Sequence, residues 1–334
     1  MAEDAHQSGE DRLIARFFRP LATDPGALGL SDDAATITPP PGSDVVLKTD
    51  AVVGGMHFFP DDPPDLIAKK ALRVNLSDLA AKGASPAGFL LSLALPETVD
   101  ESWLEAFARG LGEDAKAYGC PLMGGDTDRT TGPVTIAIAA FGIVPCGTMV
   151  RRSGAQPGDR VVVTGTIGDG ALGLHLRRDP DTGRRWHIDP RQHEHLLGRY
   201  LLPQPRNAIA EALRQHASAA MDVSDGLVGD LGKLCAVSGV GADIEVARVP
   251  LSEAARAALA SDPSLIETAL TGGDDYEVVA TVPPDAMAAL AAAAKAAGVA
   301  LNDIGSIRAG RQGAWFLDHA GKALLFKRPS FSHF

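Results

Sequence analysis

Two hydrophobic patterns alternate along the chain. Continuous apolar runs bounded by Gly or Pro predict buried strands, as in AGFLLSLALP (87–96) and GPVTIAIAAFGIV (132–144). Between these runs, the segment ESWLEAFARGLGEDAKAY carries apolar residues at helical spacing, namely Trp103, Phe107, Leu111, Ala115 and Tyr118. This stripe predicts an amphipathic helix that covers a sheet.

Further segments extend the alternation of helices and strands. Apolar periodicity predicts helices at residues 10–18, 64–84, 206–217, 225–238 and 285–298. Apolar, β-branched runs predict strands at residues 44–55, 161–166, 219–223, 242–249 and 276–282. The segment RRDPDTGRRWHIDPRQHEH (177–195) has neither pattern and is predicted to be a variable surface excursion. We therefore expect an α/β (α+β) protein in which each sheet is covered by helices.

A domain boundary is expected near the middle of the chain. Gly and Pro punctuate the polar segment RRSGAQPGDR (151–160), and a new predicted strand follows it. The length of 334 residues gives room for two domains with substantial cores. We expect a disordered tail over residues 1–12, an N-terminal domain over 13–148 and a C-terminal domain over 149–334.

Composition narrows the classes of function. The formal net charge of -11 disfavours a nucleic-acid surface, which needs a basic face, and no Lys/Arg run indicates a membrane patch. No apolar run approaches the roughly 20 residues that span a bilayer, and the acidic N-terminus lacks the features of a signal peptide. Cys120, Cys146 and Cys235 lie far apart and fit small residues in a reducing cytosol better than a zinc site or a disulfide framework. We expect a cytoplasmic protein.

Familiar nucleotide and hydrolase motifs do not account for the chain. The segment GDGALG (168–173) matches GxGxxG, but no strand ending in an acidic residue follows about 20 positions on, as a dinucleotide site requires. A glycine turn that packs a helix on a strand explains this segment better. The sequence contains no GxxxxGK[ST], HRD, DFG or GxSxG motif.

Aspartates recur beside Gly, Ser or Thr in the segments SDDAA (31–35), KTDAVVGGMHF (48–58), VNLSDLAA (74–81), LMGGDTDRTTG (122–132), MDVSDGL (221–227) and LTGGDDYEV (270–278). Each alone is more simply a turn or cap residue. If the segments converge, however, two bare carboxylates about 4 Å apart repel by about 4 kcal/mol at an effective dielectric constant of 20. Such a cluster needs cations, and Mg²⁺ held by carboxylates completes its shell with water and substrate phosphate.

In this order, the motifs resemble those of the thiamine-monophosphate kinase family, within the aminoimidazole-ribonucleotide synthetase-like superfamily. RRSGAQPGD (151–159) and the C-terminal PSFSHF extend the resemblance over nearly the whole chain. The resemblance implies an N-terminal domain that forms a homodimer, with ATP bound near the interface, and a C-terminal domain that completes the substrate site. It implies in-line, Mg²⁺-assisted transfer of the γ-phosphoryl group of ATP to thiamine monophosphate, giving thiamine diphosphate without a covalent enzyme intermediate.

The resemblance also implies roles for single residues. Several Mg²⁺ ions would bind Asp33, Thr49, Asp50, Asp78, Asp126, Asp222 and Asp225, with Asp50, Asp126 and Asp222 as the catalytic set. ATP would contact Tyr118, Gly125, Asp126, Arg152 and Ser224, although Tyr118 fits the apolar helix stripe equally well. Thiamine monophosphate would contact His57, Asp274 and Phe331. Within SDDAA, Asp33 would bind the metal and Asp32 would orient it.

Three positions depart from the family pattern. Ser31 stands where Gly is usual, Lys48 where Ser or Thr is common, and Asp274 where Glu is common. Because an ammonium group cannot ligate a metal, a cation site near Lys48 depends on the backbone carbonyl. Two alternative functions stay open: another ATP-dependent synthetase of the superfamily, resembling aminoimidazole-ribonucleotide synthetase, and a non-catalytic protein that binds nucleotide and Mg²⁺.

Overall fold

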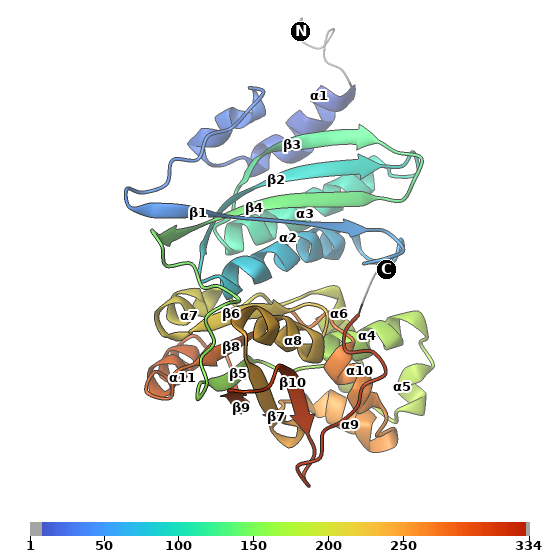
Figure 1. Cartoon of the computed structure of the whole chain (residues 1–334). Helices are drawn as coiled ribbons and strands as arrows, with labels where there is room; N and C mark the ends of the chain where they lie inside the picture. Colours follow the sequence, from blue (N-terminus) through green and yellow to red (C-terminus); the bar gives the residue numbers. More distant parts are fainter. Residues whose placement is uncertain (1–8, 332–334) are drawn as a thin grey trace, which may run out of the picture. The chain divides into compact units, whose positions relative to one another are not determined.

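The computed structural model of the chain describes residues 9–331, which form two compact units (Figure 1). The first unit comprises Met1–Leu79 and Ser85–Gly147, and the second comprises Ala80–Ala84 and Thr148–Phe334. Each unit contains one sheet with covering helices, which confirms the predicted fold class. The unit boundary lies beside the expected division at 148/149. The segment Ala80–Ala84 groups with the second unit, and no pattern in the sequence predicts this.

The first unit is built on a four-stranded sheet with the strand order β1-β4-β2-β3. The strands are β1 (Ser43–Val53), β4 (Thr135–Pro145), β2 (Ser85–Leu95) and β3 (Leu122–Arg129). Strand β4 runs antiparallel to β1 and β2, whereas β3 runs parallel to β2. Two helices cover one face of this sheet (Figure 1), namely α2 (Pro64–Ala81) and α3 (Glu101–Ala117).

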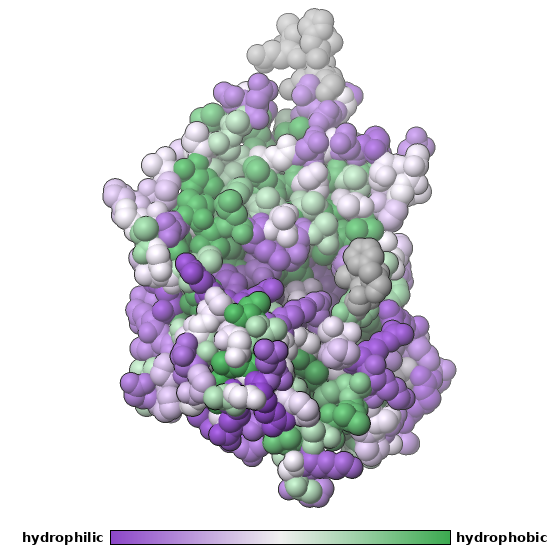
Figure 2. Space-filling view, viewed as in Figure 1, coloured by the Kyte–Doolittle hydropathy of each residue, from purple (hydrophilic) through white to green (hydrophobic). Residues whose placement is uncertain are grey.

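The two faces of this sheet differ in burial. Along β4, buried residues alternate with half-buried ones, because successive side chains point to opposite faces. The buried set faces α2 and α3. The other face is apolar but open: Leu47 is 71% exposed, and Val45 and Leu90 are each 37% exposed. Figure 2 shows hydrophobic residues gathered over this sheet.

Two predictions for the first unit need correction. Residues 9–12, predicted as part of a tail, belong to α1 (Gly9–Leu13), which continues as a π-helix over Ile14–Phe18; residues 1–8 lie outside the described residues. No strand is predicted over residues 122–129, whereas Gly125 and Asp126, for which the resemblance implies contact with ATP, lie inside strand β3. The Gly-rich, charged composition of this strand hides it from a reading of apolar periodicity.

The second unit is built on a six-stranded sheet with the order β10-β7-β9-β5-β8-β6. Its strands are β5 (Arg160–Thr164), β6 (Ala219–Val223), β7 (Gly241–Glu245), β8 (Glu277–Val282), β9 (Leu301–Arg308) and β10 (Gly313–Leu317). All pairs are antiparallel except β10 with β7. Helices cover both faces, so β5 is buried on both sides: Val161 and Val163 join one apolar cluster, and Val162 joins the other.

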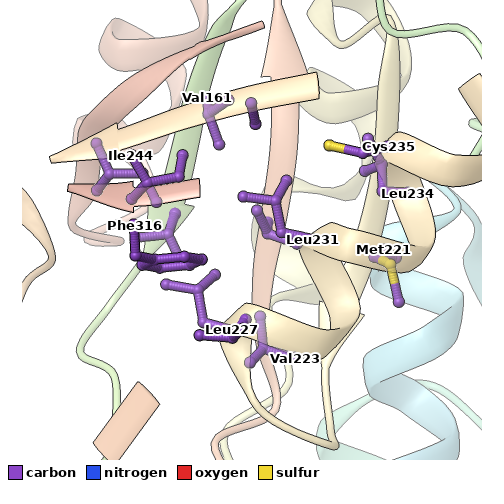
Figure 3. Packing of buried hydrophobic residues seen from close by; sticks show 14 of the residues in the cluster. Val161, Met221, Val223, Leu227, Leu231, Leu234, Cys235, Ile244 and Phe316 are labelled. Atoms are coloured by element: carbon purple, nitrogen blue, oxygen red, sulfur yellow. The ribbon is translucent and has the colours of Figure 1, made fainter. Parts of the chain in front are cut away.

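The first of these clusters is packed by α8 (Leu227–Ser238), whose residues Leu227, Leu231 and Leu234 lie against the sheet (Figure 3). The opposite cluster is packed by α7 (Ala210–His216) and α11 (Met287–Ala296). The remaining helices are α4 (Asp169–Arg178), α5 (Thr182–Arg185), α6 (Pro190–Leu201), α9 (Glu253–Ser261) and α10 (Leu265–Thr271). None of the helices within residues 9–331 combines the length and apolar character needed to cross a membrane.

The predicted surface excursion at 177–195 is wrong in part. This segment contains α5 and the first half of α6, and it is anchored by Trp186, which is only 6% exposed. Trp186 packs in a separate apolar cluster with Leu176 and Leu196. One buried aromatic residue therefore fixes a segment whose composition is polar, and a periodicity search over such a segment does not detect the anchor.

Candidate active site

A pocket of about 950 Å³ lies over the open face of the first unit's sheet. Its apolar lining comes from the strands, with Leu47 and Leu90 as examples, and from Ile14 and Phe18 in the N-terminal segment. The polar lining includes four residues implied by the resemblance, namely Asp33, Thr49, Gly125 and Asp126. The structure thus places several of these residues and an apolar floor in one cavity.

Asp33 reaches the pocket from a turn with unusual backbone geometry. The φ angles of Leu28 and Leu30 are 51° and 53°, and the Ser31 hydroxyl donates a hydrogen bond of 2.6 Å to the Leu28 carbonyl. The Asp32 carboxylate accepts the backbone N–H of Asp33 at 2.8 Å. Asp32 therefore stabilises the turn, as predicted for the member of the pair that orients the other, while Asp33 is exposed and lines the pocket.

Gly125 allows two strands to approach closely beside Asp126. A Cβ atom on Gly125 would lie 1.9 Å from the Leu91 carbonyl oxygen of the paired strand, so no other residue fits there without moving the backbone. Asp126 is the next residue of β3 after Gly125. Its side chain is exposed and accepts the backbone N–H of Thr127 at 2.9 Å. Within the described residues, neither Asp33 nor Asp126 forms an ion pair.

The strand register separates two groups of predicted metal ligands. Asp126 pairs with Ser92, Ser92 with Ala137, and Ala137 with Ala51, the neighbour of Asp50 on β1. Strands β1 and β3 are the two edges of the sheet, three strand spacings or roughly 14 Å apart. Thr49 and Asp50 therefore lie across the sheet from Asp126, too far to share a metal ion with it inside one copy of the chain.

Asp50 and Asp78 lie together, and Lys48 lies between them. The Lys48 Nζ atom is 3.1 Å from Asp50 Oδ1 and 2.8 Å from Asp78 Oδ2. Burial by itself lowers the pKa of the ammonium group, but the charges and hydrogen bonds of the two aspartates outweigh burial and hold this pKa above its ordinary value. The position where the resemblance implies a metal ion thus contains a charged side chain.

Two further predicted residues of the first unit have structural contacts. Tyr118 caps the C-terminal end of α3, and the Arg73 guanidinium lies over its ring at 5.5 Å, in a cation–π contact. The Nδ1 atom of His57 accepts the backbone N–H of Val53 at 3.0 Å and so closes the turn after β1. Neither residue lines the pocket.

In the second unit, three segments far apart in the sequence meet at the predicted residues. The backbone N–H of Asp274 donates to the Ser224 carbonyl at 2.9 Å, and that of Phe331 donates to the Asp225 carbonyl at 3.0 Å. Asp222 lies just before Ser224, at 3% exposure in β6. The structure thus places Asp222, Ser224, Asp225, Asp274 and Phe331 in one neighbourhood.

Asp225 of this group and Arg152, a further predicted residue of the second unit, need comment. The Asp225 carboxylate forms an ion pair of 2.6 Å with Lys233, which also contacts Asp230 at 2.9 Å. Asp225 therefore has an internal counter-ion, as Asp78 does. Arg152 has an exposed side chain, and its carbonyl accepts a hydrogen bond of 3.1 Å from the Ser238 hydroxyl. That contact holds the backbone of Arg152 in place.

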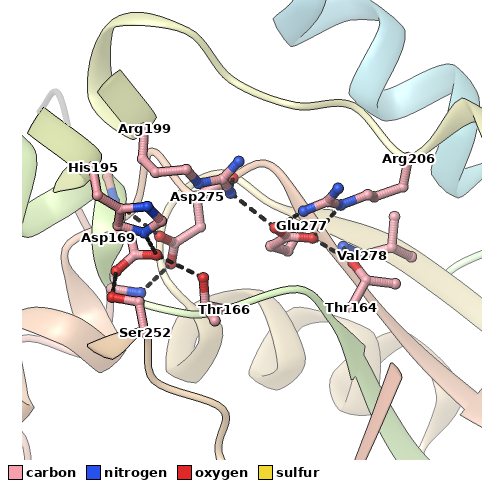
Figure 4. Close-up of polar contacts among 12 residues, drawn as sticks. Thr164, Thr166, Asp169, His195, Arg199, Arg206, Ser252, Asp275, Glu277 and Val278 are labelled. Atoms are coloured by element: carbon pink, nitrogen blue, oxygen red, sulfur yellow. Dashed lines mark hydrogen bonds and ion pairs between the residues drawn. The ribbon is translucent and has the colours of Figure 1, made fainter. Parts of the chain in front are cut away.

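The loop that carries Asp274 is strained and held by a buried polar network (Figure 4). Its φ angles are positive at Gly273 (79°), Asp274 (62°) and Tyr276 (50°), a conformation that costs energy for the two side-chain residues. The Asp275 carboxylate holds this loop, because its two oxygens accept the N–H groups of Gly168 (2.8 Å) and Gly170 (3.1 Å). Burial raises the pKa of Asp275 well above the ordinary range of aspartate, although these bonds oppose the shift.

Sequence reasoning did not identify this network, although the GDGALG segment contains part of it. Gly168 lies in the turn between β5 and α4, as predicted for a glycine turn, and the backbone N–H groups of Gly168 and Gly170 donate to the buried Asp275 carboxylate. In the same network, Glu277 is fully buried and pairs with Arg199 at 2.8 Å and with Arg206. Asp169 accepts hydrogen bonds from Thr166 and Ser252 and contacts His195 at 3.0 Å (Figure 4).

The donor set fits Mg²⁺ bound together with a nucleotide. Within residues 9–331, no group of three His, Cys, Asp or Glu residues is close enough to hold a metal ion. The pocket instead presents single oxygen donors, from the Asp33 and Asp126 carboxylates and the Thr49 hydroxyl. Mg²⁺ is commonly bound by one or two carboxylates and completes its octahedron with water and substrate phosphate. Separated hard donors beside an open pocket match that behaviour.

The fold and pocket define a class of two-domain protein. Residues 31–144 match the family described as AIR synthase related protein, N-terminal domain, and residues 156–318 match AIR synthase related protein, C-terminal domain. These matches cover both sheets and most of the aspartate motifs.

Individual relatives narrow this class. The chain is 44% identical over 296 residues to the thiamine-monophosphate kinase of Caulobacter vibrioides, spanning 87% of this chain and 82% of that protein. The crystal structure of thiamine-monophosphate kinase from Stenotrophomonas maltophilia is similar with a TM-score of 0.82 and 38% identity, covering 96% of this chain and 98% of the other. The structure of "AaThiL complexed with AMPPCP and TMP" is similar with a TM-score of 0.75 and 30% identity, covering 91% of each chain. The chain belongs to the thiamine-monophosphate kinase family.

Proposed function

We propose that this chain transfers the γ-phosphoryl group of ATP to thiamine monophosphate and releases thiamine diphosphate and ADP. The observation that carries the proposal is the likeness, over 91% of both chains, to a structure that contains AMPPCP and TMP. The pocket of the first unit supports it, because the exposed carboxylates of Asp33 and Asp126 lie in its lining. Carboxylates beside an open pocket can hold Mg²⁺ together with the phosphates of a nucleotide.

In this proposal the acidic residues hold the charge of the nucleotide phosphates through Mg²⁺. The proposed ligands are Asp33, Thr49, Asp50, Asp78, Asp126, Asp222 and Asp225, with Asp50, Asp126 and Asp222 closest to the reaction. Bound Mg²⁺ would neutralise the charge that develops on the phosphoryl oxygens. Lys48 contacts one oxygen of Asp50 and one of Asp78, so any metal bound by these two residues uses their other oxygens.

The remaining residues bind and orient the two substrates. For ATP we propose Gly125, through its backbone, with Arg152, Ser224 and Tyr118. For thiamine monophosphate we propose His57, Asp274 and Phe331; the Phe331 ring is 41% exposed and offers a flat apolar surface. Phosphoryl transfer needs positioning and charge neutralisation more than covalent chemistry, and no protein nucleophile enters the scheme.

We further propose that the protein works as a homodimer. Asp126 lies on β3, and Thr49 and Asp50 lie on β1, at opposite edges of one sheet. A second copy that places its β1 edge beside the β3 edge of the first brings these ligands together. The same arrangement covers the open apolar face, where Leu47 is 71% exposed. Burial of such a face is favourable at about 25 cal/mol per Å².

The activity is tested with purified full-length protein, ATP, Mg²⁺ and thiamine monophosphate. Products are oxidised to fluorescent thiochromes and separated by chromatography. We expect thiamine diphosphate to form in proportion to enzyme and to disappear when Mg²⁺ is chelated. A preparation that binds ATP but forms no diphosphate above the enzyme-free control would refute the kinase proposal.

A further inference from the structure

Two of the predicted metal ligands, Asp50 and Asp78, form ion pairs with a lysine of the protein, Lys48. The Lys48 ammonium lies 3.1 Å from Asp50 Oδ1 and 2.8 Å from Asp78 Oδ2, within ion-pair distance of both. Lys48 and Asp50 are two positions apart on β1, so their side chains emerge from the same face of the strand. Asp78 comes from the last turn of α2, which packs on that face.

This contact is not a loose surface pair. The side chain of Lys48 is 27% exposed and that of Asp78 only 13% exposed, so water screens the charges weakly. Two carboxylates brought together at the edge of a core repel unless a cation lies between them. Here the ammonium supplies that cation. It is covalently fixed to the strand, so it is present whether or not any ion is bound.

The pocket carboxylates differ on this point. In the part of the chain that the structure describes, Asp33 and Asp126 form no ion pair, and each is exposed in the pocket. An ion can approach them without displacing a positive group. An ion that approached the Lys48-facing oxygens of Asp50 and Asp78 would meet an ammonium, which repels it and has no lone pair to offer as a ligand.

We propose that the Lys48 ammonium takes the place of one divalent metal ion between Asp50 and Asp78. This inference rests on the proposed function only in treating the carboxylates as metal ligands. Its consequence is a difference in stoichiometry: the chain binds one divalent ion fewer than a variant in which a neutral residue replaces Lys48. Lys48 is thus a positioning residue, which holds two carboxylates in place through charge.

The test counts bound ions rather than product. Full-length protein is titrated with Mn²⁺ in the presence of AMPPCP, and free Mn²⁺ is followed by electron paramagnetic resonance. We expect Lys48→Thr to bind one more Mn²⁺ per chain than the natural protein. The additional ion should be lost again in the double variant Lys48→Thr/Asp78→Asn. Equal numbers in Lys48→Thr and the natural protein would overturn the proposal.

Matched variants separate the charge of Lys48 from other effects. Lys48→Arg keeps the charge and should bind as many ions as the natural protein. Lys69→Thr removes a lysine of the same unit that pairs with Glu113 at 2.6 Å, and it should change nothing. If Lys48→Thr loses its cooperative melting transition, Lys48→Gln keeps more of the length of the side chain without its charge, and the same gain of one ion is expected.

A crystal of the natural protein grown with Mn²⁺ and AMPPCP gives a test that needs no variant. Anomalous scattering locates manganese directly. We expect no manganese bonded to both Asp50 Oδ1 and Asp78 Oδ2, and a manganese peak there with Lys48 displaced would overturn the proposal. The kinase assay on the natural protein is independent of these results. A protein without activity whose Lys48→Thr variant still gains an ion would refute the proposed function and not this inference.

Discussion

At the scale of single residues, Asp126 gives the most direct test of the proposed site. It follows a glycine whose Cβ position is filled by the Leu91 carbonyl, it is exposed in the pocket, and its carboxylate accepts the backbone N–H of Thr127. Asp126→Asn keeps the shape and that hydrogen bond but removes the charge. We expect turnover to fall by about 100-fold or more, the size typical for loss of one electrostatic contact to a transition state. The thiochrome assay measures this directly.

A neighbouring residue provides the control for Asp126. Asp128 lies two positions further along the same strand and is also exposed, but it does not line the pocket. Asp128→Asn should keep nearly full activity, and both variants should melt within a few degrees of the natural protein. Nearly full activity in Asp126→Asn would show that this carboxylate is only a strand residue.

Residue types and their order predict much of the chemistry but not the partner of each charge. The sequence predicts that Asp32 serves the turn and that Asp33 faces the site, and the hydrogen bond from Asp33 N–H to Asp32 agrees with this division. The ion pair of Lys48 with Asp78 is different. Thirty residues separate the two positions, and only the packing of α2 on β1 brings them together.

At the scale of elements, the loop before β8 depends on charges buried beneath it. Glu277 is fully buried at the start of β8 and accepts hydrogen bonds from Thr164 (2.6 Å), Arg199 (2.8 Å) and Arg206. Glu277→Gln leaves two partly buried guanidinium groups without their negative partner. We expect a loss of about 3–5 kcal/mol in the free energy of unfolding, as for other broken buried ion pairs. Urea denaturation followed by circular dichroism measures the change.

An exposed glutamate of the same unit gives the matched comparison. Glu245 is 60% exposed and forms an ion pair of 3.2 Å with Arg248. Glu245→Gln should change the free energy of unfolding by no more than about 1 kcal/mol, because water already screens an exposed pair. If Glu277→Gln were equally mild, the network in Figure 4 would contribute little to holding the Asp274 loop.

Helices and strands whose side chains are buried in a regular pattern are predicted more accurately than those without such a pattern. The run AAMDV coincides with β6, in which all five residues are buried. The 64–84 helix ends at Ala81, three residues early, where the chain enters the second unit. By contrast, β3 escaped detection because its Gly-Gly-Asp run is stabilised by pairing with β2 and not by its own side chains. Local periodicity predicts the elements whose own side chains are buried. It does not predict elements that form mainly through pairing with a strand distant in the sequence.

At the scale of the whole molecule, the sheet of the first unit is incomplete in two respects. One face is apolar and open, and the proposed metal ligands on its two edges are too far apart to bind one ion within one copy of the chain. The sequence predicts a homodimer only through resemblance. The register of the strands provides an independent physical reason, because it assigns Asp50 and Asp126 to opposite edges. In the proposed homodimer, the second copy would bring the proposed ligands together and cover the apolar face.

This arrangement predicts complementation between two inactive variants. If each site takes Asp126 from one copy and Asp50 from the other, a mixed dimer of Asp50→Asn and Asp126→Asn has one site with both aspartates intact and one site with neither. Random reassociation of equal amounts makes half of the dimers mixed, so the unfractionated mixture should regain about a quarter of the natural activity and isolated mixed dimers about half. The two variants are co-expressed with different tags, mixed dimers are isolated by both tags, and their mass is checked by light scattering. Asp126→Asn paired with a differently tagged copy of itself should stay inactive. Mixed dimers without activity would show that each site is built within one copy, and the edge-to-edge contact would then be wrong.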